Sequence, residues 1–175
     1  MIISVDKAKQ LVNLNGWDDA KIDMKLKAIE QTIRAYTNNN FQNRCIRSEC
    51  SVSDGFLHGI IDGFSVGDTV QISESRFNGG LHVISSVDDD SIDVGEMLVD
   101  EDRVLVTKVE YPADVIAAAV NLMEWEVNNR SKVGVQSETL SRHSVTYFNM
   151  DSANQIMGYP ASLLGCLRAY RKARS

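Results

Sequence analysis

The 175-residue sequence has few of the residues that mark secreted or disordered proteins. It contains two prolines, three cysteines and 11 glycines, and no low-complexity tract. So little proline argues against extensive disorder. Cys45, Cys50 and Cys166 are odd in number and stand in no metal-like arrangement, which favours a reducing compartment. We therefore expect a folded protein made in a cytoplasm.

Long apolar runs are also missing. The longest is VIAAAV at residues 115–120, and MIISVDKAKQ at the start places no basic cluster before an apolar stretch. The sequence therefore predicts neither a signal peptide nor a membrane span. With 43% hydrophobic and 24% charged residues, it is typical of one domain, or of one domain with an insert, that buries a real core.

Charge is distributed unevenly along the chain. Residues 52–110 contain 13 acidic and 3 basic residues, a net charge of −10, whereas the remainder contains 15 basic and 11 acidic residues, a net charge of +4. A change of hydrophobic period coincides with this change of charge. We therefore predict an acidic inserted domain at 45–110, between flanks 1–44 and 111–175.

The flanks show helical patterns. One short helix is predicted from a cap at Ser4 to Leu14, and a longer one from a cap at Asp18 or Asp19 to the TNNN sequence at 37–40. The apolar residues of the longer helix form a single stripe: Ile22, Leu26, Ile29, Ile33 and Tyr36. Pro112 and Pro160 each fit the first turn of a further helix, the last one carrying Leu163, Leu164, Leu167 and Tyr170 inward.

The middle segment shows the period of two that is typical of strands. Val70 and Ile72 share one face of DTVQIS, Leu81 and Val83 share one face of LHVISSV, and RVLVTKV at 103–109 is rich in β-branched residues. FNGG at 77–80 predicts a tight hairpin, and VDDDS at 87–91 a second turn. We predict an α+β fold: a mainly α-helical body of about four helices with a small, barrel-like antiparallel β insert.

Several motifs imitate catalytic or metal sites. GFSVG at 63–67 matches a nucleophile elbow around Ser65, but a strand pattern follows it where the elbow needs a helix. The acidic run at 88–96 lacks the glycine and glutamate of a calcium loop. Cys45 and Cys50 lack further ligands for zinc. We therefore predict no enzyme activity, no cofactor and no metal.

The three histidines give no better candidate. His58, His82 and His143 lie in separate segments, and a lone histidine is more often a hydrogen-bonded structural residue than a base or a ligand. Alanine at Ser65, His82 or His143 is therefore expected to abolish no reaction.

The segment GVQSETLSRHSVTYFN at 134–149 keeps no helical period between two predicted helices. The chain has its opening helices, this segment and a Y-P…L…Y-R ending in the same order as the head-tail connector proteins of tailed bacteriophages, which it resembles. These proteins are also called adaptor or head-completion proteins. The segment itself is similar to the G-V-x-S-E…S-V-T-Y stretch that follows the central helix of related connectors. The insert departs from the smallest members, in which little separates the long helices.

The resemblance implies a structural subunit of the virion, assembled in the bacterial host. Such a subunit docks beneath the portal as a homo-oligomeric ring, joins the DNA-filled head to a tail or stopper protein, and continues the DNA channel. We then expect 130–158 to be an extended arm that is completed by a neighbouring subunit, anchored by Val135, Leu140, Val145, Tyr147 and Phe148. The basic C-terminal residues are the expected contacts to the portal or another partner: Arg168, Arg171, Lys172 and Arg174.

Two other interpretations remain open. A sequence pI of about 5.0 fits a channel through which DNA slides, without stable binding, better than a DNA clamp. The alternative is a small nucleic-acid-binding module that uses the β insert and the basic tail, although the insert is acidic and lacks interleaved aromatic and basic residues. For the arm, the alternative is a surface loop without a partner.

Overall fold

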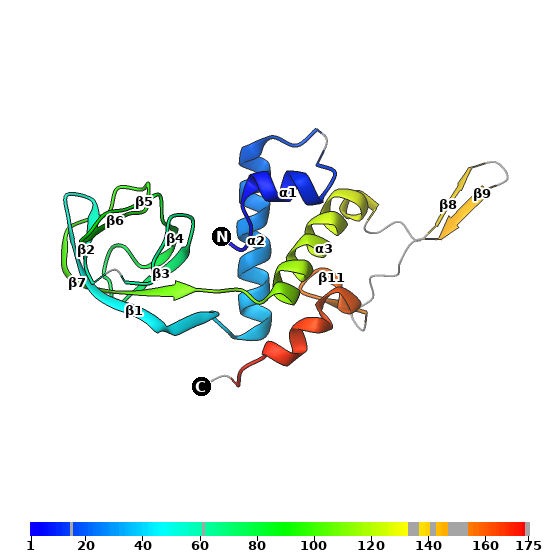
Figure 1. Cartoon of the computed structure of the whole chain (residues 1–175). Coiled ribbons are helices and arrows are strands. Elements are labelled where there is room, and N and C mark those ends of the chain that lie inside the picture. Colours follow the sequence, from blue (N-terminus) through cyan, green and yellow to red (C-terminus); the bar gives the residue numbers. More distant parts are fainter. Residues whose placement is uncertain (15, 61, 133–136, 141–142, 147–153, 174–175) are drawn as a thin grey trace. The chain divides into compact units, whose positions relative to one another are not determined.

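The structure is a computed structural model that describes the chain except residues 15, 61, 133–136, 141–142, 147–153 and 174–175 (Figure 1). The chain divides into two compact units. Met1 and Asn40–Tyr111 form the first, here called the β unit, and Ile2–Asn39 with Pro112–Ser175 form the second, here called the α unit. The insert predicted at 45–110 lies a few residues inside this division.

One curled antiparallel sheet makes up the β unit (Figure 1). Its strands pair in the order β4-β3-β7-β1-β2-β6-β5, so that β4 and β5 form the two edges of a half-barrel. The strands are β1 (Gln42–Ser53), β2 (Phe56–Gly59), β3 (Thr69–Ser73), β4 (Gly80–Val83), β5 (Ser86–Val87), β6 (Ser91–Asp93) and β7 (Glu101–Val109).

The expected mainly α-helical body with a small β insert is wrong. The curled seven-stranded sheet is the largest feature, and about 29% of residues lie in strands against about 36% in helices. No strand was expected at residues 42–53, because that segment is largely polar. Here β1 pairs with β7 on one side and with β2 on the other, so backbone pairing gives this polar segment its strand conformation.

The core of the β unit lies against one face of the curled sheet. Val70 and Ile72 share one face of β3, as predicted, and that face is buried with Leu57 on β2 and Val104 and Val106 on β7. The period of two predicted a strand with Leu81 and Val83 on one face, and β4 is a strand there, but this face is not part of the core. Since β4 is an edge strand, Leu81 is half-buried and Val83 exposed, and Ile84 beyond its end enters the core instead.

The predicted turns of the β unit had different outcomes. Asp88–Asp90 connect β5 to β6, and the Asp88 amide donates to the Ser91 carbonyl at 2.9 Å, which confirms the turn at 87–91. The tight hairpin expected at 77–80 is wrong. Residues 74–79 form a longer loop, because the Glu101 carboxylate accepts hydrogen bonds from Ser75, from the amide of Arg76 and from Asn78.

The first two helices of the α unit confirm their predicted caps. In α1 (Val5–Leu11) the Ser4 hydroxyl accepts from the Lys7 amide at 3.3 Å, and in α2 (Asp19–Thr37) the Asp18 carboxylate accepts from the Lys21 amide at 2.7 Å. Asn38, at a φ of 48°, ends α2. Four residues of the predicted stripe are fully buried: Ile22, Leu26, Ile29 and Ile33.

Helix α3 (Ala113–Asn129) packs against α2 through its apolar face. Pro112 precedes the helix as its cap instead of lying in its first turn. Short elements come next along the chain: η1 (Arg130–Lys132), β8 (Ser137–Leu140), β9 (His143–Thr146), β10 (Gln155–Ile156) and β11 (Tyr159–Pro160). The chain then continues through η2 (Ala161–Leu164) and η3 (Cys166–Tyr170).

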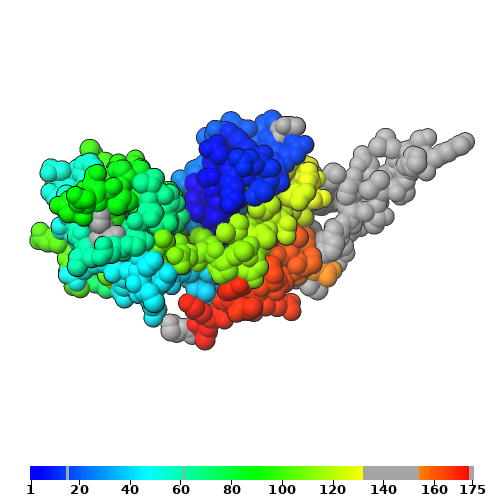
Figure 2. Space-filling view, viewed as in Figure 1, coloured from blue at the N-terminus to red at the C-terminus, as the bar shows by residue number. Residues whose placement is uncertain are grey.

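The α-helix predicted after Pro160 is wrong, because η2 and η3 are 3-10 helices. Their amides bond three residues back, as in Gly165 to Ser162 and Arg168 to Gly165, each at 3.3 Å. Pro160 itself belongs to β11, paired with Gln155. Leu164 and Leu167 are still fully buried as predicted, and η3 lies at the surface of the α unit against α3 (Figure 2).

Candidate functional site

The arm begins after α3 and ends at the strands β10 and β11. Its middle contains an antiparallel hairpin in which β8 pairs with β9, with Leu140 opposite His143 and Glu138 opposite Val145. Leu140 and Val145 thus lie on the two strands of one hairpin. The other predicted anchors, Val135, Tyr147 and Phe148, lie outside the described residues.

A buried carboxylate lies where the arm begins. Glu126, one turn before the end of α3, has a side chain only 2% exposed. Its carboxylate accepts hydrogen bonds from the Arg130 guanidinium and from the Tyr159 hydroxyl, the latter at 2.7 Å, and forms an ion pair with Lys25 of α2 at 3.2 Å. We call Lys25, Glu126, Arg130 and Tyr159 the arm-base network.

Electrostatics keep this carboxylate ionised. Burial by itself would raise the pKa of Glu126, but the hydrogen bonds from Arg130, Tyr159 and Lys25 outweigh it and lower that pKa to about 2. The pKa of Tyr159 is raised, chiefly by burial and then by its hydrogen bond to Glu126. At neutral pH the network therefore contains an anion, a neutral phenol and two cations that surround the anion.

The network also connects the two ends of the arm. Arg130 donates from Nη1 to the carbonyl of Gly158 at 3.1 Å, and it stacks on Trp125 and on Tyr159, with its guanidinium carbon 4.5 Å and 5.1 Å from the ring centroids. The Trp125 and Tyr159 rings meet at 5.3 Å. Arg130, the first residue of the arm, is thus hydrogen-bonded to Gly158, its last residue.

That returning turn has a defined conformation. Met157 and Gly158 connect β10 to β11, and both have positive φ angles, 52° and 79°. Positive φ at both central residues is typical of the type I′ turn of two-residue hairpins. This hairpin was not predicted, because only Gly158 favours such a conformation and the strands are two residues long.

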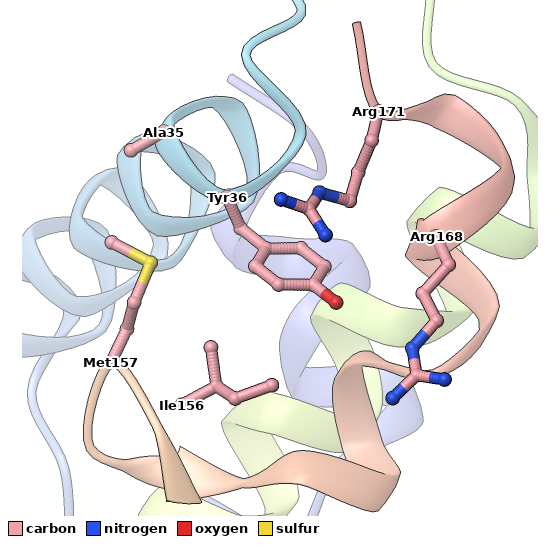
Figure 3. A pocket seen from close by; sticks show the side chains of 6 residues that line it. All are labelled: Ala35, Tyr36, Ile156, Met157, Arg168 and Arg171. Atoms are coloured by element: carbon pink, nitrogen blue, oxygen red, sulfur yellow. The ribbon is translucent and has the colours of Figure 1, made fainter. Parts of the chain in front are cut away.

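A pocket of about 670 Å³ lies on the surface of the α unit (Figure 3). Two predicted partner contacts, Arg168 and Arg171, line it together. The other lining residues are Ala35, Tyr36, Ile156 and Met157, and we call this set the basic pocket. Arg171 stacks on Tyr36 with its guanidinium carbon 5.4 Å from the ring centroid.

The basic pocket includes only part of the predicted partner surface. Lys172 has an exposed side chain, and its amide bonds the Thr37 carbonyl at 2.8 Å, so its backbone ties the C-terminal segment to α2. Arg174 lies outside the described residues. Tyr36 was predicted to face inward; it is half-buried and lines the pocket. Its place at the end of the apolar stripe gave no signal of this role.

The sequence motifs that imitate catalytic or metal sites lie in separate places. Ser65 is in the loop between β2 and β3, where its amide bonds Asp68 at 2.8 Å. His82 contacts Glu96 and the Asn78 carbonyl, each at 3.1 Å. Cys45 is exposed and Cys50 is buried on the same strand. Among the described residues, no three histidine, cysteine or acidic side chains are grouped as metal ligands would be.

Comparison with protein-family models and with curated proteins finds no match to this sequence. In the part of the chain that the structure describes, no helix combines the length and the apolar character needed to cross a membrane.

Proposed function

We propose that the chain is a structural subunit of a head-tail connector: a ring that docks beneath the portal of a tailed phage, joins the head to a tail or stopper protein and continues the DNA channel. The observation that carries the proposal is the arm-base network. It brings the two ends of the arm together, because Arg130 donates a hydrogen bond to the Gly158 carbonyl, so that residues 130–158 begin and end at one place in the α unit.

The hairpin inside the arm supports a role in assembly. A two-stranded hairpin is marginally stable by itself in water, and each of its strands has one edge left for pairing with another chain. Among the described helices and strands, the partner that β8 contacts extensively is β9, and the reverse holds for β9. A neighbouring subunit that adds a strand, or that covers the apolar residues of the arm, would stabilise it.

The charge distribution supports a channel more than a clamp. The chain has a net charge of −6, and most of its excess acid lies in the β unit. Stable duplex binding depends on many lysine and arginine contacts to phosphates. A ring of such subunits would let DNA pass without holding it, and we expect no stable complex with duplex DNA.

The test replaces Leu140, Val145 and Tyr147 together by serine and measures docking to portal rings of the same virus by electron microscopy. We expect the variant to keep its circular dichroism spectrum and melting temperature but to lose portal occupancy. A matched control replaces three exposed apolar residues outside the arm by serine: Met24, Ile60 and Val66. Unchanged occupancy in the arm variant would refute the proposed role of the arm, and failure of the wild-type chain to dock would refute the proposed function.

A further inference from the structure

The loop between β6 and β7 exposes an apolar side chain among carboxylates. We call residues 94–100 the Met97 loop. Met97 is 96% exposed, the largest exposure among the large hydrophobic residues of the described chain, and Val99 is 52% exposed. Glu96 and Asp100 lie on either side. An exposed methionine beside acidic residues is suited to a protein contact that is apolar at its centre and charged around it.

Hydrogen bonds hold this loop in place. The buried side chain of Asn78 accepts from the Val99 amide at 2.8 Å and donates to the Val99 carbonyl at 2.7 Å. The Gly95 amide donates to the Asp93 carboxylate at 2.7 Å, and Leu98 is buried between the two exposed residues. Met97 is therefore presented outward by a fixed backbone, which lowers the entropy lost when it binds a partner.

The carboxylates of the loop are held as well. Glu96 contacts His82 at 3.1 Å, and Asp100 accepts from the Asp54 amide at 3.1 Å. Each carboxylate of the loop therefore has a partner within the β unit. A partner surface for this loop needs an apolar hollow with cationic groups at its margin.

The basic pocket has that chemistry. Tyr36, Ile156 and Met157 supply apolar surface, and Arg168 and Arg171 supply two guanidinium groups (Figure 3). Within the described chain neither arginine has a carboxylate partner, and Arg171 contacts the Tyr36 ring. Arginine, tyrosine and methionine are enriched in the buried centres of protein interfaces.

We propose that the Met97 loop of one copy of this chain binds the basic pocket of a second copy, with Met97 between Tyr36 and Met157 and with the acidic residues of the loop facing Arg168 and Arg171. The inference rests on the proposed ring, since a contact between two different patches of the same chain is heterologous and repeats around a closed ring. It assigns a contact role to the acidic β unit, for which the sequence predicted no partner.

Photocross-linking of the full chain tests this contact. Position 97 carries p-benzoyl-phenylalanine, and rings are assembled on portals from a mixture of nitrogen-15-labelled and unlabelled copies. We expect cross-linked peptides that join position 97 of one copy to the segment containing Tyr36 or Met157 of another. The control places the same photoreactive residue at Ile60, which is 75% exposed in the same unit, and should give no cross-link to the pocket. Cross-links confined to one copy, or only to the portal, would overturn the inference.

Charge reversal gives a second, independent test. Arg168→Glu with Arg171→Glu should reduce the cross-link yield by more than about tenfold, because like charges then face each other across the contact. Adding Glu96→Arg and Asp100→Arg to the same chain should restore the yield. If the combined variant keeps its fold, as judged by circular dichroism, and recovers no yield, the proposed pairing is wrong.

The two proposals fail in different ways. If wild-type copies form rings on portals but position 97 never reaches the pocket of a second copy, the connector function stands and the Met97 contact falls. If the chain does not dock to portals, yet concentrated copies cross-link between position 97 and the pocket in solution, the contact stands and the connector function falls.

Discussion

Replacing Glu126 by glutamine should destabilise the α unit and change how its stability depends on pH. Glutamine has the shape of the protonated acid, so the variant removes the charge and keeps the volume. The folded protein lowers the pKa of Glu126 from its ordinary value of 4.5 to about 2. One pH unit of difference between the folded and unfolded pKa corresponds to about 1.4 kcal/mol. The ionised carboxylate thus contributes about 3 kcal/mol to the free energy of unfolding at neutral pH.

The sign of the pH dependence follows from the direction of the shift. Because the pKa is lower in the folded state, the stabilisation is fully present above about pH 4.5 and is lost as the pH falls toward 2. About half of it should remain near pH ~3.2. The difference in stability between wild type and Glu126→Gln should therefore be about 3 kcal/mol at pH ~7 and should shrink steadily below pH ~4.5.

Urea unfolding at a series of pH values measures this difference. Both tryptophans, Trp17 and Trp125, lie in the α unit, so tryptophan fluorescence reports on that unit alone. Comparing the two proteins at each pH isolates the contribution of this one carboxylate. Glu124→Gln is the matched control, since Glu124 is exposed on the same helix and its substitution should change stability by less than about 0.5 kcal/mol. A loss below about 1 kcal/mol for Glu126→Gln, or a difference that stays constant between pH ~5 and ~2.5, would refute this account of the network.

Three further predictions concern the turn, the thiols and the division of the chain. Gly158→Ala should lower the free energy of unfolding in urea by about 1–2 kcal/mol. Gly158 has a φ of 79° and the added Cβ meets nothing closer than 3.8 Å, so backbone strain is the main effect. An unchanged unfolding midpoint would contradict the assigned turn. A thiol reagent should label Cys45 and Cys166 quickly in the native protein, and Cys50 only on unfolding. Cys50 is buried, and burial raises the pKa of its thiol. Equal labelling rates for the three thiols would contradict this prediction. The isolated fragment 40–111 should unfold cooperatively when followed by circular dichroism. Its two ends already lie together, because the Phe41 and Tyr111 ring centroids are 5.0 Å apart. A non-cooperative transition would show that the β unit needs the rest of the chain.

Local signals in the sequence predicted the features that depend on neighbouring residues. Ser4 and Asp18 are recognisable helix caps, because a short polar side chain before an apolar repeat can accept from the first free amides. The stripe of α2 from Ile22 to Ile33 follows from the helical period alone. The turn at Asp88–Asp90 follows likewise from consecutive residues that favour turns.

The fold class could not be predicted in this way. Strand β1 contains few apolar residues, and its conformation depends on its pairing with β7, whose paired residues are 49 to 67 positions further along the sequence. The last helix was predicted because Pro160 fits the first turn of a helix and the leucines after it fit an inward face. The pairing of Pro160 with Gln155 places the start of that segment in a strand, and the residues after Pro160 form two 3-10 helices.

The candidate site divides in the same way. The sequence alone determined that basic residues gather near the C-terminus and that acid is concentrated in the middle of the chain. Only the tertiary structure decided that Arg168 and Arg171 share a pocket with Tyr36 and Met157. It likewise buried Glu126 among cationic and phenolic partners, one of them, Tyr159, 33 residues away. Periodicity cannot reveal such a group, because a buried charge is stabilised by the set of partners that folding brings to it.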